Sequence, residues 1–119
     1  MKILITGAHG FIGQNLVSRL ECGGRHALFC AGRDTPPETL EAWAQDCGFV
    51  FHLAGINRPK NPEAFMPGNL GPTQALISAL EAHRNACPVV FASSIQAALP
   101  NPYGLSKKAC EQEIGRAHV

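Results

Sequence analysis

Near its start the chain reads Lys2-Ile3-Leu4-Ile5-Thr6-Gly7-Ala8-His9-Gly10-Phe11-Ile12-Gly13. A short apolar run leads into three glycines, and the residues that follow are apolar at helical spacing. Strand, glycine turn and helix in this order are typical of the phosphate-binding start of a dinucleotide fold. We expect Gly7 to allow the turn, Gly10 to let backbone approach a pyrophosphate, and Gly13 to let the helix pack closely. The alternative is a tight turn in an ordinary α/β protein.

The composition is that of one globular domain. The chain has 119 residues, 45% of them apolar, and a net charge of +1 with scattered basic residues. This argues against nucleic acid as a partner and against membrane insertion, since no apolar run approaches spanning length. The first strand starts at once, so no signal peptide is expected, and five widely spaced cysteines indicate reduced thiols in a cytoplasmic protein. The histidines share no ligand spacing with them, so we predict no metal site.

Strand and helix patterns alternate along the chain. The sequence predicts strands over 3–5, 27–31, 49–53 and 88–92, and helices over 10–21, 39–45, 72–83 and from 103 onward. The proline-rich segment 57–68 is predicted to be an excursion over the sheet, and 93–102 a loop. The fold class is therefore α/β, a Rossmann-type doubly wound parallel sheet of order 3-2-1-4, truncated after the fourth strand and its helix. The fourth strand is expected to be an unpaired, apolar edge.

The end of the predicted second strand bears on cofactor choice. NAD-binding proteins usually place an acidic residue there, about 20 residues past the glycines. Here small neutral residues precede Arg33, whose guanidinium can pair with a 2′-phosphate. The sequence thus favours NADP(H), with NAD(H) as the alternative because Asp34 follows directly. Arg33 as a solvated loop charge is the other interpretation.

Three residues near the fourth strand suggest redox chemistry. Tyr103 and Lys107 are four residues apart on a predicted helix, so they share a face. A nearby ammonium favours the phenolate, which lets a tyrosine exchange a proton with a carbonyl or alcohol oxygen. A serine hydroxyl from Ser93-Ser94, at the end of the preceding strand, can hold that same oxygen. This group is what hydride transfer to or from a nicotinamide requires.

By these motifs the chain resembles the extended short-chain dehydrogenase/reductase family, also called the NAD-dependent epimerase/dehydratase family. The matching stretches are the glycine turn, His52-Leu53-Ala54-Gly55, Asn69 before a helix, Ser93-Ser94 and Pro102 to Lys107. The resemblance implies Ser94, Tyr103 and Lys107 as the catalytic triad. The implied cofactor lining, with Gly13 and Gly55 added from the strand-end clusters, is Gly7, Gly10, Phe11, Ile12, Gly13, Arg33, Leu53, Ala54, Gly55, Asn69, Tyr103 and Lys107.

Within the family the chain looks most like reductases of 4-keto UDP-amino sugars in capsular polysaccharide synthesis. Members that dehydrate hexoses carry Asp-Glu after the catalytic Ser or Thr, whereas this chain has Ile95-Gln96, which do not titrate. Dehydration therefore lacks its proton carriers, and reduction or 4-epimerisation remains. The resemblance implies reduction, with 4-epimerisation as one alternative and a non-catalytic NADP-binding regulatory module as another. Candidate substrate contacts are Asn57, Arg58 and Gln96. The resemblance also implies a homodimer for the full-length protein.

The last residues differ from the rest of the chain. Residues 1–113 are predicted to be the N-terminal part of an NAD(P)-binding Rossmann domain, without its substrate domain. We expect 114–119 to be a non-native tail, because Gly115 interrupts the helical pattern and the segment matches translated sequencing adapter, ATC GGA AGA GCA CAC GTC.

Overall fold

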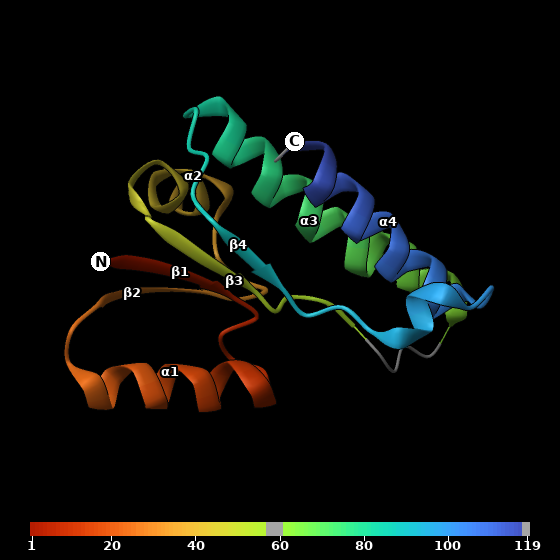
Figure 1. Ribbon diagram of the computed structural model, residues 1–119, viewed down its shortest axis with the longest axis horizontal. Helices are drawn as coiled ribbons and strands as arrows, with labels where there is room; N and C mark the ends of the chain where they lie inside the picture. Colours follow the sequence, from red (N-terminus) through yellow and green to blue (C-terminus); the bar gives the residue numbers. More distant parts are fainter. Residues whose placement is uncertain (57–60, 118–119) are drawn as a thin grey trace.

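A single parallel sheet flanked by helices makes up the computed structural model, which describes residues 1–56 and 61–117 (Figure 1). The strands are β1 (Lys2–Thr6), β2 (Ala27–Ala31), β3 (Phe49–His52) and β4 (Val89–Phe91). The helices are α1 (Phe11–Gly23), α2 (Pro37–Asp46), α3 (Phe65–Ala82) and α4 (Pro102–Ala117), with 3-10 turns η1 (Pro62–Ala64) and η2 (Ile95–Ala98). The prediction of an α/β, Rossmann-type parallel sheet is confirmed, because every described strand pair is parallel.

The predicted strand order is wrong. The sheet runs β2-β1-β3-β4, so β3 pairs with β1 and not with β2. The order follows from burial: Ile3–Thr6 of β1 are all buried and have a strand on each side, whereas β2 is a partly exposed edge. A strand that is apolar on both faces, as β3 is, suits either position, so its pattern could not decide the order. After β1 the next strand, β2, is added on one side and β3 on the other, so the strand order reverses between β1 and β3; in such sheets this switch point is where ligands bind.

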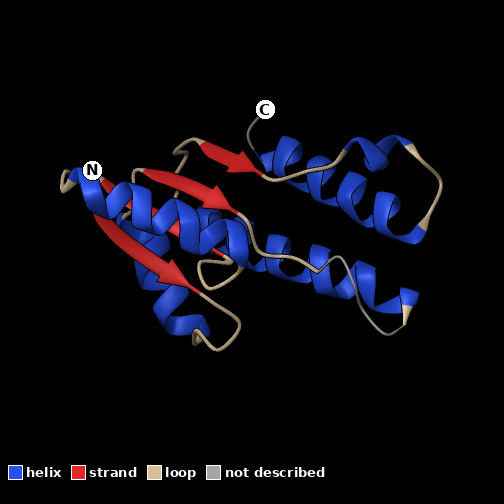
Figure 2. Ribbon diagram, turned by 90° about the horizontal axis from the view of Figure 1, so that it is seen from below, coloured by secondary structure: helices blue, strands red, loops and turns tan. Residues whose placement is uncertain are grey.

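Helices cover the two faces unequally. On one face α1 packs its apolar residues against Ile3 and Ile5, which alternate with the buried Leu4 on the other face. Figure 1 shows α2, α3 and α4 on that second face, with α3 and α4 side by side. Figure 2, viewed from below, shows the face that α1 covers. β4 is the last strand on its side among the described residues, and Val90 is 45% exposed, as the edge prediction required.

Helix α3 begins earlier than its sequence suggests. The excursion predicted over 57–68 ends in η1 and the first turn of α3, and the helix predicted from Pro72 starts at Phe65. Pro72 lies inside the helix, where it removes one backbone donor and would ordinarily break the pattern. The helix continues because Leu76, Ile77 and Leu80 on the same face are buried in the core. Tertiary packing here outweighs local propensity.

Helix α4 also continues further than predicted. It runs to Ala117, so the expected break at Gly115 is wrong. Ile114 packs against the core, and Arg116 pairs with Glu81 on α3 and with Glu113. A glycine inside an exposed helix costs only about 1 kcal/mol, which these contacts offset.

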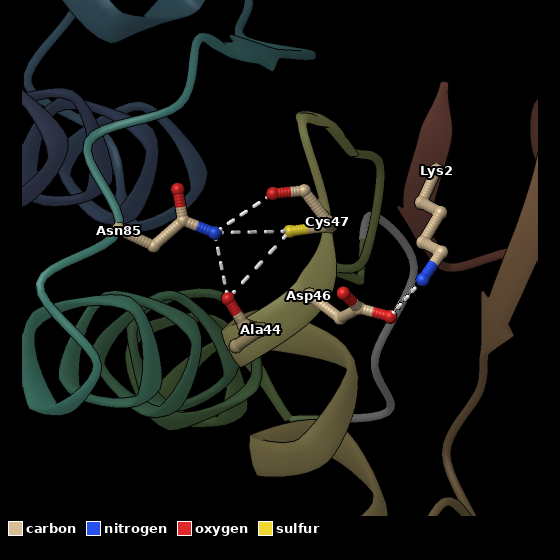
Figure 3. Close-up of polar contacts among 5 residues, drawn as sticks. All are labelled: Lys2, Ala44, Asp46, Cys47 and Asn85. Carbon is tan, nitrogen blue, oxygen red and sulfur yellow. Dashed lines mark hydrogen bonds and ion pairs between the residues drawn. The ribbon is translucent and has the colours of Figure 1, made fainter.

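The amino-terminal edge of the sheet is closed by side-chain bonds (Figure 3). The amide of Asn85, before β4, donates to the carbonyl oxygens of Ala44 at 2.7 Å and Cys47 at 2.8 Å. Its oxygen accepts the N–H of Cys87 at 3.1 Å. One side chain thereby satisfies the carboxyl end of α2 and the start of β4. Lys2 and Asp46 form an ion pair beside it.

Candidate active site

Backbone contacts explain two of the three glycines in the turn after β1. Gly7 has a φ of 65°, and a Cβ there would lie 2.7 Å from the backbone nitrogen of Ala54. A Cβ at Gly13 would lie 2.1 Å from the Gly7 oxygen, so α1 could not pack where it does. At Gly10 a Cβ would meet only that oxygen, at an ordinary 3.5 Å. The fold does not need a glycine at this position, which fits the predicted approach of a ligand.

The first turn of α1 is open at its amino end. Gly10 is the N-cap and supplies no side-chain cap bond. Phe11 and Ile12 are 85% and 63% exposed. Exposed N–H groups and the positive end of the helix dipole suit an anionic group such as a pyrophosphate.

A groove of about 1420 Å³ runs along the carboxyl edge of the sheet and over α2 and α3. Predicted cofactor residues from three strand ends meet in its lining: Gly7, Gly10, Arg33, Leu53, Ala54 and Gly55. The structure therefore brings together residues that are far apart in the sequence. The groove lies outside the carboxyl ends of the strands, where open α/β sheets bind their ligands.

The turn after β2 holds Arg33 at the surface. Both Arg33 and Asp34 are exposed there. The turn is fixed by Thr35, whose Oγ1 accepts the Gly32 N–H at 2.8 Å while its own N–H donates to the Gly32 oxygen at 3.1 Å. Thr35 was missing from the predicted site, because its hydroxyl bonds back to Gly32 and not forward along the chain as in the usual Ser/Thr turn.

Lys107 lies buried between two aromatic rings. It is 7% exposed, and its Nζ donates to the Ala92 oxygen at 3.1 Å. Nζ is 5.1 Å from the ring centre of Phe91 and 5.8 Å from that of Tyr103, so the predicted pair does share one helix face. Burial lowers the pKa of the Lys107 ammonium. The Tyr103 ring packs edge-on against Phe65 of α3, 5.3 Å away, a contact the sequence did not suggest.

Gly55 connects the groove with this lysine. It lines the groove, and a Cβ at Gly55 would lie 3.4 Å from Lys107 Nζ. The same Cβ would lie 2.5 Å from Asn69 Oδ1. A side chain at this position would therefore separate the loop after β3 from α3 and α4.

Ser94 is the N-cap residue of η2, three residues after the end of β4. Its Oγ accepts the N–H of Gln96 at 3.1 Å, so the hydroxyl caps this turn. Gln96 is exposed, and its carbonyl oxygen would lie 2.0 Å from a Cβ at Gly104, which seats η2 on the first turn of α4. Ser93 donates to Glu111 on α4. The loop that carries Ser94 is thus fixed to the helix that carries Tyr103.

Asn69 is buried, and its amide is used within the protein. Oδ1 accepts the Ile56 N–H at 2.7 Å, and Nδ2 donates to the Ile56 oxygen at 3.2 Å and to Ser106 Oγ at 2.8 Å. The side chain holds the loop after β3 against α3 and α4. Its predicted contact with a cofactor stays a prediction.

The sequence assigned no role to His52, which is fully buried at the end of β3. Its ring nitrogens lie 2.6 Å from Thr6 Oγ1 and 2.8 Å from Thr73 Oγ1. Burial, and to a lesser degree the charge of Lys107, lowers the pKa of His52 to about 4. No local pattern in the sequence marks these contacts, because Thr6 and Thr73 lie 46 and 21 residues away from His52 in the chain.

The remaining predictions concern the substrate contacts, a membrane-spanning segment and a metal site. The candidate substrate residues Asn57 and Arg58 lie outside residues 1–56 and 61–117. Within those ranges no helix is both long and apolar enough to span a membrane. Nor do three or more metal-ligating side chains come together in this part of the chain.

Comparisons with known proteins agree on the kind of fold. The profile of the NAD dependent epimerase/dehydratase family matches residues 3–117. A Pseudomonas aeruginosa protein, UDP-2-acetamido-2,6-beta-L-arabino-hexul-4-ose reductase, is 42% identical over 114 residues, which are 96% of this chain and 31% of that protein. The chain thus spans about a third of the length of this relative.

Solved structures are similar over nearly the whole chain. The capsular polysaccharide assembling protein CapF from Staphylococcus aureus is 38% identical with a TM-score of 0.83, covering 98% of this chain and 32% of its own. MoeE5, solved with UDP-glucose and NAD, is 26% identical with a TM-score of 0.76, covering 98% of this chain and 50% of its own.

Proposed function

Because the chain belongs to the NAD dependent epimerase/dehydratase family, we propose that it forms the cofactor-binding and catalytic part of a nucleotide-sugar oxidoreductase. The reaction we propose is reduction of a 4-keto UDP-amino sugar for surface polysaccharide synthesis. One observation carries the proposal: Gly55 lines the groove that begins at the glycine turn and also lies against Lys107, beside Tyr103. A dinucleotide in this groove would therefore reach the residues that handle protons.

The residues present fit a nicotinamide dinucleotide. The uncapped start of α1 suits its pyrophosphate, and the absence of a Cβ at Gly10 leaves space for it. Gly7, Gly10, Leu53, Ala54 and Gly55 would line it, with Phe11 and Ile12 at the exposed helix start. When bound, such a cofactor supplies or accepts a hydride.

The side chains of the chain itself would control the proton. Tyr103 would donate its hydroxyl proton to the carbonyl oxygen of the sugar during reduction. Lys107 holds its Nζ over the Tyr103 ring, 5.8 Å from the ring centre, and so lies next to this proton donor. The Ser94 hydroxyl would hold the same carbonyl oxygen, since η2 fixes it next to the start of α4.

We propose NADP(H) as the preferred cofactor. Arg33 stands exposed where the groove passes the end of β2, and the turn built on Thr35 fixes the backbone around it. A guanidinium there can pair with a 2′-phosphate. Asp34 in the same turn keeps NAD(H) as the alternative, and MoeE5 was solved with NAD.

A 4-epimerase is the second candidate reaction, since it uses the same proton donor and cofactor. A non-catalytic NADP-binding module is the third, and the intact Tyr103–Lys107 pair argues against it. Dehydration is disfavoured because Ile95-Gln96 offer no acid or base. We expect the full-length protein to be a cytoplasmic homodimer whose substrate domain lies outside residues 1–113.

The test is turnover by a full-length protein that carries this segment. Incubated with a 4-keto UDP-amino sugar, a reductase oxidises NADPH in proportion to product. An epimerase interconverts the two 4-hydroxy sugars without net oxidation of cofactor. Binding of NADPH without either reaction would leave only the regulatory module.

A further inference from the structure

The last row of side chains on the α3 side of the sheet joins the glycine turn to the catalytic lysine. Thr6, His52 and Phe91 are register partners at the carboxyl ends of β1, β3 and β4. His52 bonds to Thr6 on one side and stacks on Phe91 on the other, with ring centres 5.6 Å apart. Lys107 Nζ lies over that Phe91 ring. His52 is thus the middle of a continuous row between two halves of the site.

Hydrogen-bond counting fixes the proton on His52. Thr6 Oγ1 accepts the backbone N–H of Ala54 at 3.1 Å and that of Leu53 at 3.0 Å, the latter shared with the Thr6 backbone oxygen at 3.2 Å. A hydroxyl has two acceptor lone pairs and one proton, so with two N–H groups directed at Oγ1 its proton is left for His52 Nδ1. His52 therefore carries its own proton on Nε2 and donates it to Thr73 Oγ1 at 2.8 Å.

Thr73 completes the row on α3. Its hydroxyl proton is directed at the Asn69 carbonyl oxygen at 3.0 Å and at Cys110 Sγ at 3.3 Å, so a lone pair of Oγ1 remains for the imidazole. Thr73 and His52 are both fully buried, so solvent cannot reach the bond between His52 Nε2 and Thr73 Oγ1. Loss of the Thr73 hydroxyl would strand the Nε2–H in an apolar interior, and a stranded buried donor forces the ring to shift or rotate.

We propose that His52, held as the neutral Nε2–H form by Thr73, is a positioning residue that sets where the Leu53–Ala54 backbone and Thr6–Gly7 face the dinucleotide. The inference rests on the proposed cofactor function of the groove. Gly7 and the backbone of Leu53 and Ala54 are in contact, so a shift of Thr6 against β3 changes the width of the groove between them. His52 itself is buried and acts through these neighbours.

The test compares two variants of Thr73 in a full-length protein that carries this segment. Thr73→Val keeps the shape and removes the hydroxyl, whereas Thr73→Ser keeps the hydroxyl. Dissociation constants for NADPH are measured by fluorescence, at a temperature where circular dichroism shows each variant fully folded. We expect Thr73→Val to bind about tenfold more weakly, the equivalent of one lost hydrogen bond, and Thr73→Ser to match the unmodified protein. Ser18→Ala, which removes an exposed hydroxyl of α1 outside the groove lining, is the control and should leave affinity unchanged.

A second readout does not depend on the variants. Long-range ¹H–¹⁵N correlation of the imidazole should show His52 with its proton on Nε2 in the unmodified protein. A proton on Nδ1, or NADPH affinity unaffected by Thr73→Val, would overturn the positioning role. If the unmodified protein binds neither NADPH nor NADH, the cofactor function itself fails, and the two failures are therefore distinguishable.

Discussion

The two edges of the sheet differ in whether side chains of the protein bond the backbone groups there. At the amino edge, Asn85 satisfies the end of α2 and the start of β4 with three hydrogen bonds to backbone. At the carboxyl edge, the start of α1 has no side-chain cap and Phe11 stands exposed. Buried backbone groups normally find partners within the protein, so the first edge needs nothing more. The second edge leaves donors and apolar surface for a ligand, which is why we assign function there and stability to the first.

The largest effect should come from removing the proton donor of the carboxyl edge. Tyr103→Phe should lower kcat by about 10²–10⁴-fold, the usual contribution of general acid catalysis. NADPH affinity and the free energy of unfolding should remain close to those of the unmodified protein. Lys107→Ala should reduce both kcat and affinity, because Lys107 lies between the groove and Tyr103. Near-normal turnover by Tyr103→Phe in steady-state assays would show that another group is the acid.

Acid should weaken the fold through His52. Burial lowers the pKa of this imidazole in the folded chain to about 4, from an ordinary value of 6.5. Between these values the unfolded chain binds more protons, so stability is fully present above pH 6.5 and falls as pH drops toward 4. We expect a loss of roughly 2 kcal/mol between pH 7 and 4.5 from this group. Urea unfolding at both pH values measures it, and His52→Gln should reduce the difference by that amount; an unchanged difference would contradict the assignment.

At the amino edge, Asn85→Ala should cost stability and spare chemistry. It strands the carbonyl oxygens of Ala44 and Cys47, so we expect the free energy of unfolding to fall by about 1–3 kcal/mol. Asn85→Asp keeps the acceptor for the Cys87 N–H but loses the donors to the Ala44 and Cys47 oxygens. It therefore distinguishes the effect of the donated bonds from that of the accepted bond. Asn15→Ala, at an exposed asparagine of α1, is the control. A drop in kcat at temperatures where Asn85→Ala is folded would contradict the assignment of stability to the amino edge and function to the carboxyl edge.

A further prediction concerns cofactor choice at the end of β2. Arg33→Ala should weaken NADPH by about 1.5–3 kcal/mol, the range for a hydrogen bond to a charged group, and leave NADH nearly unchanged. Titration of both cofactors measures this. Equal losses for NADPH and NADH would remove the 2′-phosphate role of Arg33.

Local patterns in the sequence predicted the parts of the fold that local physics determines. The glycine turn after β1 and the alternation of strands and helices depend on neighbouring residues, so both are predictable. The strand order is not, because Phe49–His52 would suit any interior position in the sheet. The early start of α3 is hidden by Pro72, which the core tolerates.

The site shows the same division. Tyr103 and Lys107 could be paired from helix spacing alone. The row through His52 could not, since Thr6 and Thr73 lie 46 and 21 residues away from it in the chain. Such partners meet only when β1, β3 and α3 are placed together in space.

We assign dinucleotide binding to the carboxyl edge of the sheet and not to the amino edge. Titration of the ¹⁵N-labelled protein with NADPH, followed by backbone ¹H–¹⁵N spectra, distinguishes the two edges. We expect shifts at Gly7, Gly10, Arg33 and Ala54, with the amide of Cys87 unchanged. Absence of shifts with either NADPH or NADH, or the largest shifts around Cys87, would contradict it.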